Sequence, residues 1–222
     1  MIQDLPFLVS LIFMLTTLLT VLFFYQATYR SVVAMSVLLA WLALQGVLAF
    51  NGYYTVTAGA PPRFALAVIP PLLFILLLFL TARGRAWLDG LDIRVLTLLH
   101  IVRIPVELTL FRLYLYHQVP ALLTFEGRNF DILSGVSAPI VYYFGFVKNK
   151  LSKGAYLAWN IVCLGLLANI VITAILSAPF SFQRFAFSQP NQAILYFPFV
   201  WLPCCIVPLV LLSHLACIRK LL

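Results

Sequence analysis

Charged residues are scarce in this sequence, and acidic ones are the scarcest. Only 9% of the 222 residues are charged and only six are Asp or Glu, whereas 64% are hydrophobic and the mean hydropathy is +1.08. Soluble domains carry about 25% charged residues, so this composition excludes a soluble domain. Because apolar runs of about 20 residues, the length of a bilayer-spanning helix, recur along the chain, we predict an all-α, polytopic membrane helical bundle, with residues 1–222 forming a single integral-membrane domain.

Several functional motifs are missing. The interiors of the apolar stretches contain no lysine, which excludes a retinal Schiff base of the rhodopsin type. The His-Glu-x-x-His zinc motif, the P-loop and the Gly-x-Ser-x-Gly elbow are also absent. The N-terminus has no basic residue before its first apolar run, unlike a secretory signal peptide, so we expect a retained first helix.

The hydropathy pattern predicts seven membrane-spanning stretches. The fifth is the shortest and could instead be a tilted or re-entrant segment. The seven stretches are Leu5–Phe24, Ser31–Phe50, Phe64–Leu80, Val95–Tyr116, Ile132–Val147, Ala155–Leu176 and Ile194–Cys217.

The distribution of basic residues predicts the orientation of this bundle. With the N-terminus outside, nine loop residues face the cytoplasm, namely Arg30, Arg83, Arg85, Arg94, Lys148, Lys150, Lys153, Arg219 and Lys220. Only Arg63, Arg128 and Arg184 then face outward. This excess follows the positive-inside rule and places the C-terminus in the cytoplasm. We expect a multi-pass protein of the cell membrane, specifically a bacterial inner membrane.

The net charge of +8 does not indicate a nucleic-acid partner, because the basic residues are spread over short loops. Anionic headgroups of the lipid bilayer are the partners that this distribution favours.

The fourth stretch is unusually polar for a membrane helix. At 100° per residue, His100, Arg103, Glu107 and Tyr114 fall in one narrow stripe, and Arg112 falls on nearly the opposite side. Ionisable side chains at bilayer depth cost about 2.5–3.5 kcal/mol each and mark function by default. Arg103 and Glu107 are four residues apart, so we predict that they form an ion pair.

These four residues are our candidate ligand- or proton-binding site. Arg103 would supply fixed positive charge for a small polar or anionic ligand, Glu107 would be the protonatable group, and His100 could relay protons. We therefore favour a binding or transport protein. The alternative is a buried ion pair that only orients the bundle, since such pairs are often no more stabilising than apolar ones.

A second polar group precedes the fifth stretch. We predict that Glu126, Arg128, Asn129 and Asp131 form an outer-loop gate over the site. The alternative is local, because Asn129 or Asp131 could cap the helix that follows.

His100 and His214 support a different class of function. Each lies a few residues from the inner end of its stretch, so the two should sit at similar depth. Two such histidines could ligate a metal or haem b in a membrane enzyme or redox protein; apart from this alternative, we expect no cofactor. A third class is a non-catalytic subunit or scaffold that packs against a membrane protein partner or forms a homo-oligomer.

Overall fold

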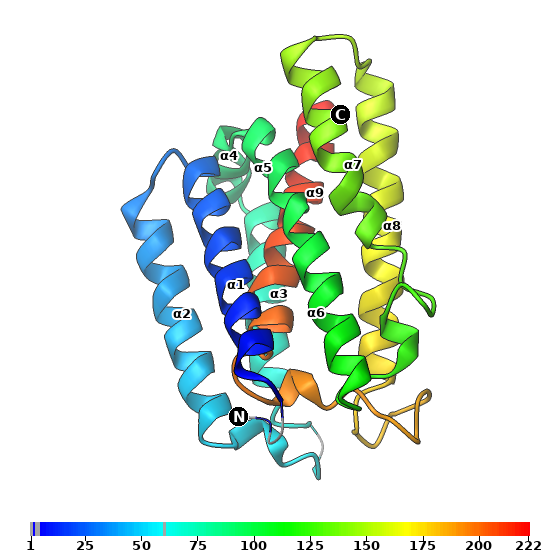
Figure 1. Cartoon of the computed structure of the whole chain (residues 1–222). Helices are drawn as coiled ribbons and strands as arrows, with labels where there is room; N and C mark the ends of the chain where they lie inside the picture. Colours follow the sequence, from blue (N-terminus) through cyan, green and yellow to red (C-terminus); the bar gives the residue numbers. More distant parts are fainter. Residues whose placement is uncertain (1, 3–4, 60) are drawn as a thin grey trace.

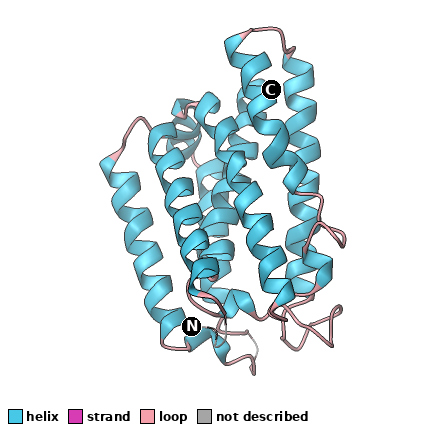
Figure 2. Ribbon diagram, viewed as in Figure 1, coloured by secondary structure: helices cyan, strands magenta, loops and turns pink. Residues whose placement is uncertain are grey.

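The computed structural model describes residues 2, 5–59 and 61–222, which are 72% helical and contain no strand (Figures 1 and 2). The long helices run roughly alongside one another, which agrees with the predicted all-α bundle. The α-helices are α1 (Phe7–Ala27), α2 (Val32–Phe50), α3 (Ala65–Leu80), α4 (Ala82–Gly90), α5 (Ile93–Leu99), α6 (Arg103–Leu115), α7 (Ile132–Tyr142), α8 (Lys153–Leu176) and α9 (Val207–Leu221).

Polar side chains mark where several helices begin. Ser31 accepts a hydrogen bond from the amide of Ala34 before α2, and Ser152 accepts one from Ala155 before α8. Asp92 accepts from the amide of Arg94 at the start of α5. These caps satisfy amides that have no partner inside the first helical turn.

In the described part of the chain, four helices are long and apolar enough to cross a membrane: Phe7–Ala27, Val32–Phe50, Lys153–Leu176 and Leu202–Leu221. A fifth crossing is added if α3 and α4 count as one broken span, since they bend by 96° at Thr81. The segment Ile132–Val147 is a shorter apolar helix that ends in a π-helical turn, Tyr143–Val147.

The fourth predicted stretch is helical but not continuous. A 3-10 turn, His100–Val102, separates α5 from α6. Pro105, the third residue of α6, lacks an amide hydrogen and disfavours a regular α-helical turn before it. The break therefore falls at the most polar part of the helix.

The prediction that the seventh helix starts at Ile194 is wrong. Ile194 lies in the short 3-10 turn Ala193–Leu195, and continuous helix begins only at the π-helical turn Leu202–Ile206. Pro198 lacks the amide hydrogen that a helix starting at Ile194 would need at that position.

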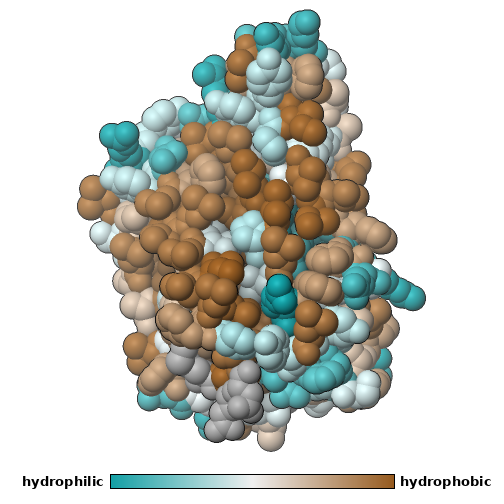
Figure 3. All heavy atoms as spheres, viewed as in Figure 1, coloured by the Kyte–Doolittle hydropathy of each residue, from teal (hydrophilic) through white to brown (hydrophobic). Residues whose placement is uncertain are grey.

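The outer surface of the bundle is apolar. Large side chains such as Val33 (74% exposed), Val162 (61%) and Leu73 (52%) face outward. Apolar residues cover the middle of the visible face, and polar ones lie mainly toward its ends (Figure 3). This distribution suits hydrocarbon around the helices rather than water, because soluble monomers rarely expose apolar patches so extensive.

The broken helix formed by α5, the 3-10 turn and α6, called the central helix below, lies between α1 and α7 in Figure 1. It packs against α1, α7 and α9, and α8 packs against α9 (Figure 1). Helix α1 begins at the lower end of the view and α9 ends at the upper end. The polar residues of the central helix are therefore surrounded by other helices.

Candidate functional site

The central helix buries three of its four candidate residues. His100 is 0% exposed, Arg103 is 3% exposed and Glu107 is 2% exposed. Tyr114 is half-buried, and its backbone carbonyl accepts a hydrogen bond from the Gln189 side chain. The break in the helix at His100–Val102 leads directly into Arg103.

Arg103 forms an ion pair with Asp131, with 2.9 Å between Nη1 and Oδ1. The prediction that Arg103 pairs with Glu107 is wrong, because Glu107 has no cationic nitrogen within 4.0 Å among the described residues. Asp131 reaches Arg103 because α7 packs against the 3-10 turn and against α6. Gly135 allows this close approach, since a Cβ there would lie 2.9 Å from Cγ1 of Ile104.

Asn129 connects the outer loop to Glu107. Its Nδ2 donates to Oε2 of Glu107 at 2.5 Å and to the carbonyl of Leu123 at 3.0 Å. Its Oδ1 accepts from the amide of Asp131 at 3.0 Å. One buried side chain thus holds the loop, the carboxyl group of α6 and the start of α7 together.

The four predicted gate residues divide into two pairs. Asn129 and Asp131 are buried and contact the site, whereas Glu126 and Arg128 are exposed. The backbone carbonyl of Arg128 accepts from Nδ2 of Asn169 in α8, at 3.0 Å. Asp131 occupies the position before α7 without capping it, because its carboxylate faces Arg103 instead.

The electrostatics of Asp131 reflect two opposing effects. Burial raises the pKa of the Asp131 carboxyl above its ordinary value, and the guanidinium of Arg103 acts in the opposite direction. The charge of Arg103 therefore supports the ionised carboxylate.

The two histidines meet in the centre of the bundle. The rings of His100 and His214 are stacked, with centroids 3.9 Å apart and planes 16° apart. The edge-on ring of Trp159 lies 5.6 Å from His100 and 5.8 Å from His214. Arg103 directly follows the 3-10 turn that begins with His100.

This stacking does not suit haem b. Two axial ligands must point ring nitrogens at an iron from opposite faces of the porphyrin, whereas His100 and His214 present their ring faces to each other. A centroid separation of 3.9 Å leaves no room for a porphyrin between them. The described residues also contain no group of three or more His, Cys, Asp or Glu side chains that could hold a metal ion.

The neighbours of His214 determine its tautomer. Nδ2 of Asn160 donates to the carbonyl of Tyr156 at 3.0 Å, so Oδ1 of Asn160 is the acceptor that faces Nδ1 of His214, also at 3.0 Å. The neutral imidazole must then carry its proton on Nδ1. Its Nε2 is left with a lone pair that can accept a proton or a hydrogen bond.

Sequence reasoning missed the residues that α8 contributes. Asn160 and Trp159 lie in a long apolar helix. The asparagine was the signal in the sequence for a polar contact with another helix, because asparagine in an apolar helix commonly forms such hydrogen bonds. Tyr156 adds a second polar contact, because its hydroxyl lies 2.6 Å from Oγ1 of Thr97 and donates to Sγ of Cys217 at 3.2 Å.

Buried polar atoms without a hydrogen-bond partner concentrate at this site. Among the described residues eleven such side-chain atoms occur, and eight of them belong to five residues of the site. We call these five residues the polar cluster: His100, Arg103, Asp131, Ser134 and His214. All three guanidinium nitrogens of Arg103 are included, because the ion pair with Asp131 is close but not aligned as a hydrogen bond. Native proteins rarely bury so many polar atoms unpaired, so these atoms mark a place where polar partners belong.

The comparison with protein families places the whole polar cluster in a single family domain. Residues 60–222 match the model of a family described as a domain of unknown function (DUF8737). The chain belongs to this family. The matched region runs from before α3 to the end of α9 and therefore contains every residue of the polar cluster. No curated protein and no solved structure matches the chain.

Proposed function

We propose that this chain is a seven-span protein of the cell membrane that binds and transports a small anionic ligand at the polar cluster. The N-terminus lies outside, the C-terminus is cytoplasmic, and the surrounding membrane is a bacterial inner membrane. Arg103 is the primary anion-binding group, and His100 and His214 flank it. The observation that carries the proposal is the buried guanidinium of Arg103, which makes no hydrogen bond through any of its three nitrogens among the described residues.

The chemistry of the cluster favours an anion as the ligand. A guanidinium presents five N–H donors in a planar fork that matches a carboxylate or phosphate. Asp131 offsets the charge of Arg103 through one contact and leaves the other donors available. Nε2 of His214 could accept a proton from the ligand or exchange one with it.

The distribution of basic segments along the bundle supports the proposed topology. The α1–α2 loop, α4, the α7–α8 loop and the end of α9 lie at the upper end of the bundle in Figure 1, and these segments carry most of the basic residues expected inside. Contacts also join separate segments at this end of the bundle. Arg219 of α9 forms an ion pair with Asp89 of α4, and the amide of Asp92 donates to the carbonyl of Ala27 in α1. The start of α1 and the end of α9 lie at opposite ends, as an odd number of crossings requires.

Reporter fusions test the topology. We expect a reporter fused after Lys150 to be cytoplasmic and one fused after Arg128 to be outside, because the proposed topology has the segment between them, Ile132–Val147, cross the membrane. A pair of reporters, one active only in the cytoplasm and one only outside, measures this. If both positions report the same side, that segment does not cross and the seven-span topology fails.

Tryptophan fluorescence tests anion binding. Trp159 touches both histidines, so we expect acetate or inorganic phosphate to change the fluorescence of detergent-purified protein with saturation. The response should be absent in Trp159→Phe, which leaves the other three tryptophans in place. Affinity should fall at least about tenfold in Arg103→Met with Asp131→Asn, because a charge-assisted hydrogen bond contributes roughly 1.5–3 kcal/mol.

Two controls make the fluorescence result decisive. A titration with chloride at the same ionic strength shows how much of the fluorescence change comes from salt screening of charges rather than from binding of acetate or phosphate. The variant Arg184→Gln removes an exposed arginine far along the chain and should respond like the wild type. Equal titration curves for the wild type and the double variant would overturn the assignment of the ligand to Arg103.

A proton path is the second candidate function. Polar side chains continue along the central helix from Thr97 through His100 and Arg103 to Glu107, which covers roughly 15 Å at 1.5 Å per residue. This row of polar side chains would conduct protons if water enters the space beside it. Proton uptake by reconstituted vesicles without any added carboxylate or phosphate would favour this candidate over the first.

A further inference from the structure

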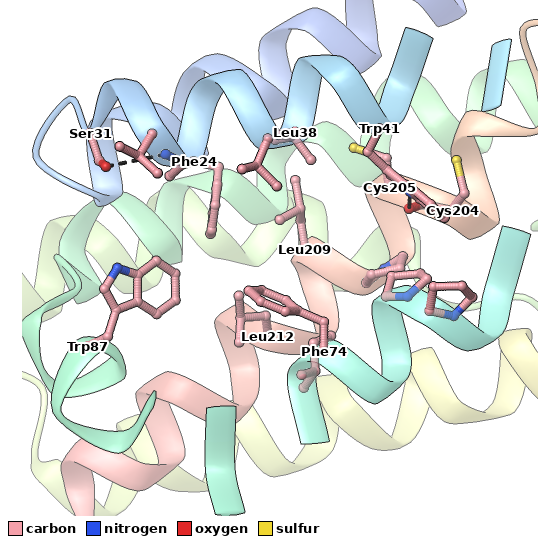
Figure 4. Close-up of a pocket in the computed structure, with 17 residues that line it drawn as sticks. Phe24, Ser31, Leu38, Trp41, Phe74, Trp87, Cys204, Cys205, Leu209 and Leu212 are labelled. Carbon is pink, nitrogen blue, oxygen red and sulfur yellow. Dashed lines mark hydrogen bonds between the residues drawn. The ribbon is translucent and has the colours of Figure 1, made fainter. Parts of the chain in front are cut away.

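A separate, apolar cavity lies on the other side of the bundle from α7 and α8. Its volume is about 550 Å³, within the range of roughly 300–1,000 Å³ that is typical of ligand pockets. Its walls come from the end of α1, from α2, α3 and α4, and from the start of the α9 helix (Figure 4). None of its lining residues belongs to the polar cluster.

The walls offer an occupant very little to bind except apolar surface. Phe24, Leu38, Phe74, Leu209 and Leu212 point toward the open space (Figure 4). Two polar groups on the walls already have partners within the protein. Nε1 of Trp41 donates to the carbonyl of Cys204 at 3.0 Å, and Ser31 accepts from the amide of Ala34. The occupant must therefore be largely hydrocarbon.

The cavity opens sideways between α2 and α3, toward the region where lipid surrounds the helices. Val33, Val37 and Phe74 line it and are also 74%, 63% and 56% exposed. Helix α2 packs against α1 and against the π-helical turn before α9. Its flank beside the cavity has few contacts with α3. A molecule in the bilayer can enter without crossing any polar surface.

The length of the cavity matches one leaflet. It runs along α2 from Ser31 to Trp41, which is roughly 15 Å at 1.5 Å per residue. That is about half of the hydrocarbon thickness of a bilayer, which is about 30 Å. One end lies beside Trp87 of α4, and tryptophan is enriched at the headgroup interface.

A basic residue lies at the same end of the cavity. Arg30 immediately precedes the lining residue Ser31 and is exposed. Arg30 and Tyr29 both adopt left-handed backbone conformations, with φ of 63° and 52°, so the chain reverses tightly there before α2 begins. A basic side chain next to this end of the cavity suits the phosphate of a lipid in this leaflet.

We propose that this cavity holds one acyl chain of a phospholipid, drawn from the leaflet at the α4 end, with the lipid phosphate beside Arg30. In the topology proposed above this is the cytoplasmic leaflet. The lipid fills the space beside α2 and holds that helix against α3 and α9. The site is independent of the polar cluster, so each proposal can fail without the other.

Native mass spectrometry of detergent-purified protein tests the proposal. We expect the wild type, washed to remove surrounding lipid, to retain one phospholipid per chain. The variant Val37→Trp should retain at least about tenfold less, because the indole fills the mouth of the cavity. Val37 is 63% exposed, so this change leaves the packed interior intact. A second variant, Ala34→Phe, fills the cavity one turn away and should have the same effect.

Matched controls distinguish this site from general lipid contact. Val47→Phe adds bulk to an exposed position of α2 outside the cavity and should retain the lipid. Arg30→Asn removes the charge but keeps a residue that tolerates a left-handed backbone, and it should lower retention severalfold. Arg184→Gln should not lower it. Equal retention in Val37→Trp and Val47→Phe, or a retained mass that is free fatty acid or detergent only, would overturn the proposal. Unchanged retention in Arg30→Asn would overturn the placement of the phosphate.

Discussion

Asp131→Asn should destabilise this protein more than Arg103→Met and Asp131→Asn together. The single change leaves the guanidinium of Arg103, 3% exposed and without a hydrogen bond among the described residues, with no neighbouring negative charge. Removing one partner of a buried ion pair costs about 3–5 kcal/mol, whereas removing both often costs far less. For a chain of this length we expect a fall in melting temperature of roughly 6–20 °C for the single variant. Thermal unfolding in one detergent, followed for both variants, measures the difference.

The exposed ion pair of Arg219 with Asp89 provides the control. Its side chains are 31% and 47% exposed, although its geometry is bidentate at 2.8 Å. Asp89→Asn should leave the melting temperature nearly unchanged, because solvent screens such a pair. Equal effects of Asp131→Asn and the double variant would mean that Asp131 does not support the charge of Arg103.

Gly127→Ala should be the most disruptive conservative change in the outer loop. A Cβ at this position would lie 2.2 Å from the carbonyl oxygen of Ala121 and 2.8 Å from Cα of Leu122, so the backbone must move. That movement pulls Asn129 away from the carboxyl of Glu107. Overpacking costs about 1–3 kcal/mol and a lost hydrogen bond to a buried group about 1–3 kcal/mol more. Together these costs predict a melting temperature lower by roughly 4–24 °C, measured by thermal unfolding.

Gly165→Ala is the matched control for this prediction. Gly165 lies within α8, where an added Cβ has no atom of the other described residues within 4 Å outside its own helical turn. Since alanine favours a helix by about 1 kcal/mol over glycine, this variant should be as stable as the wild type or slightly more stable. If Gly127→Ala unfolds at the same temperature as Gly165→Ala, the loop does not depend on this close approach.

The sequence predicted the helices better than it predicted their partners. Hydropathy located α1, α2 and α8 to within a few residues, because the signal of an apolar helix is local. It misplaced the start of the seventh helix, since Pro198 interrupts the helix while the run around it stays apolar on average.

The candidate site was predicted in part. The helical spacing grouped His100, Arg103 and Glu107, and all three are buried in the structure. The spacing permitted a pair between Arg103 and Glu107 but could not require one, because an i, i+4 contact competes with groups from other helices. Here Asp131, which follows 28 residues later in the chain, is the partner.

Composition and periodicity alone therefore determined that this chain is apolar, all-helical and polar at one central helix, because each of these properties depends on near neighbours in the sequence. Only the tertiary structure decided which polar groups meet. The stacking of His100 on His214, the anchoring of His214 by Asn160 and the apolar cavity beside α2 all depend on how separate helices pack. Packing joins residues that are distant in the chain, and hydropathy carries no information about such pairings.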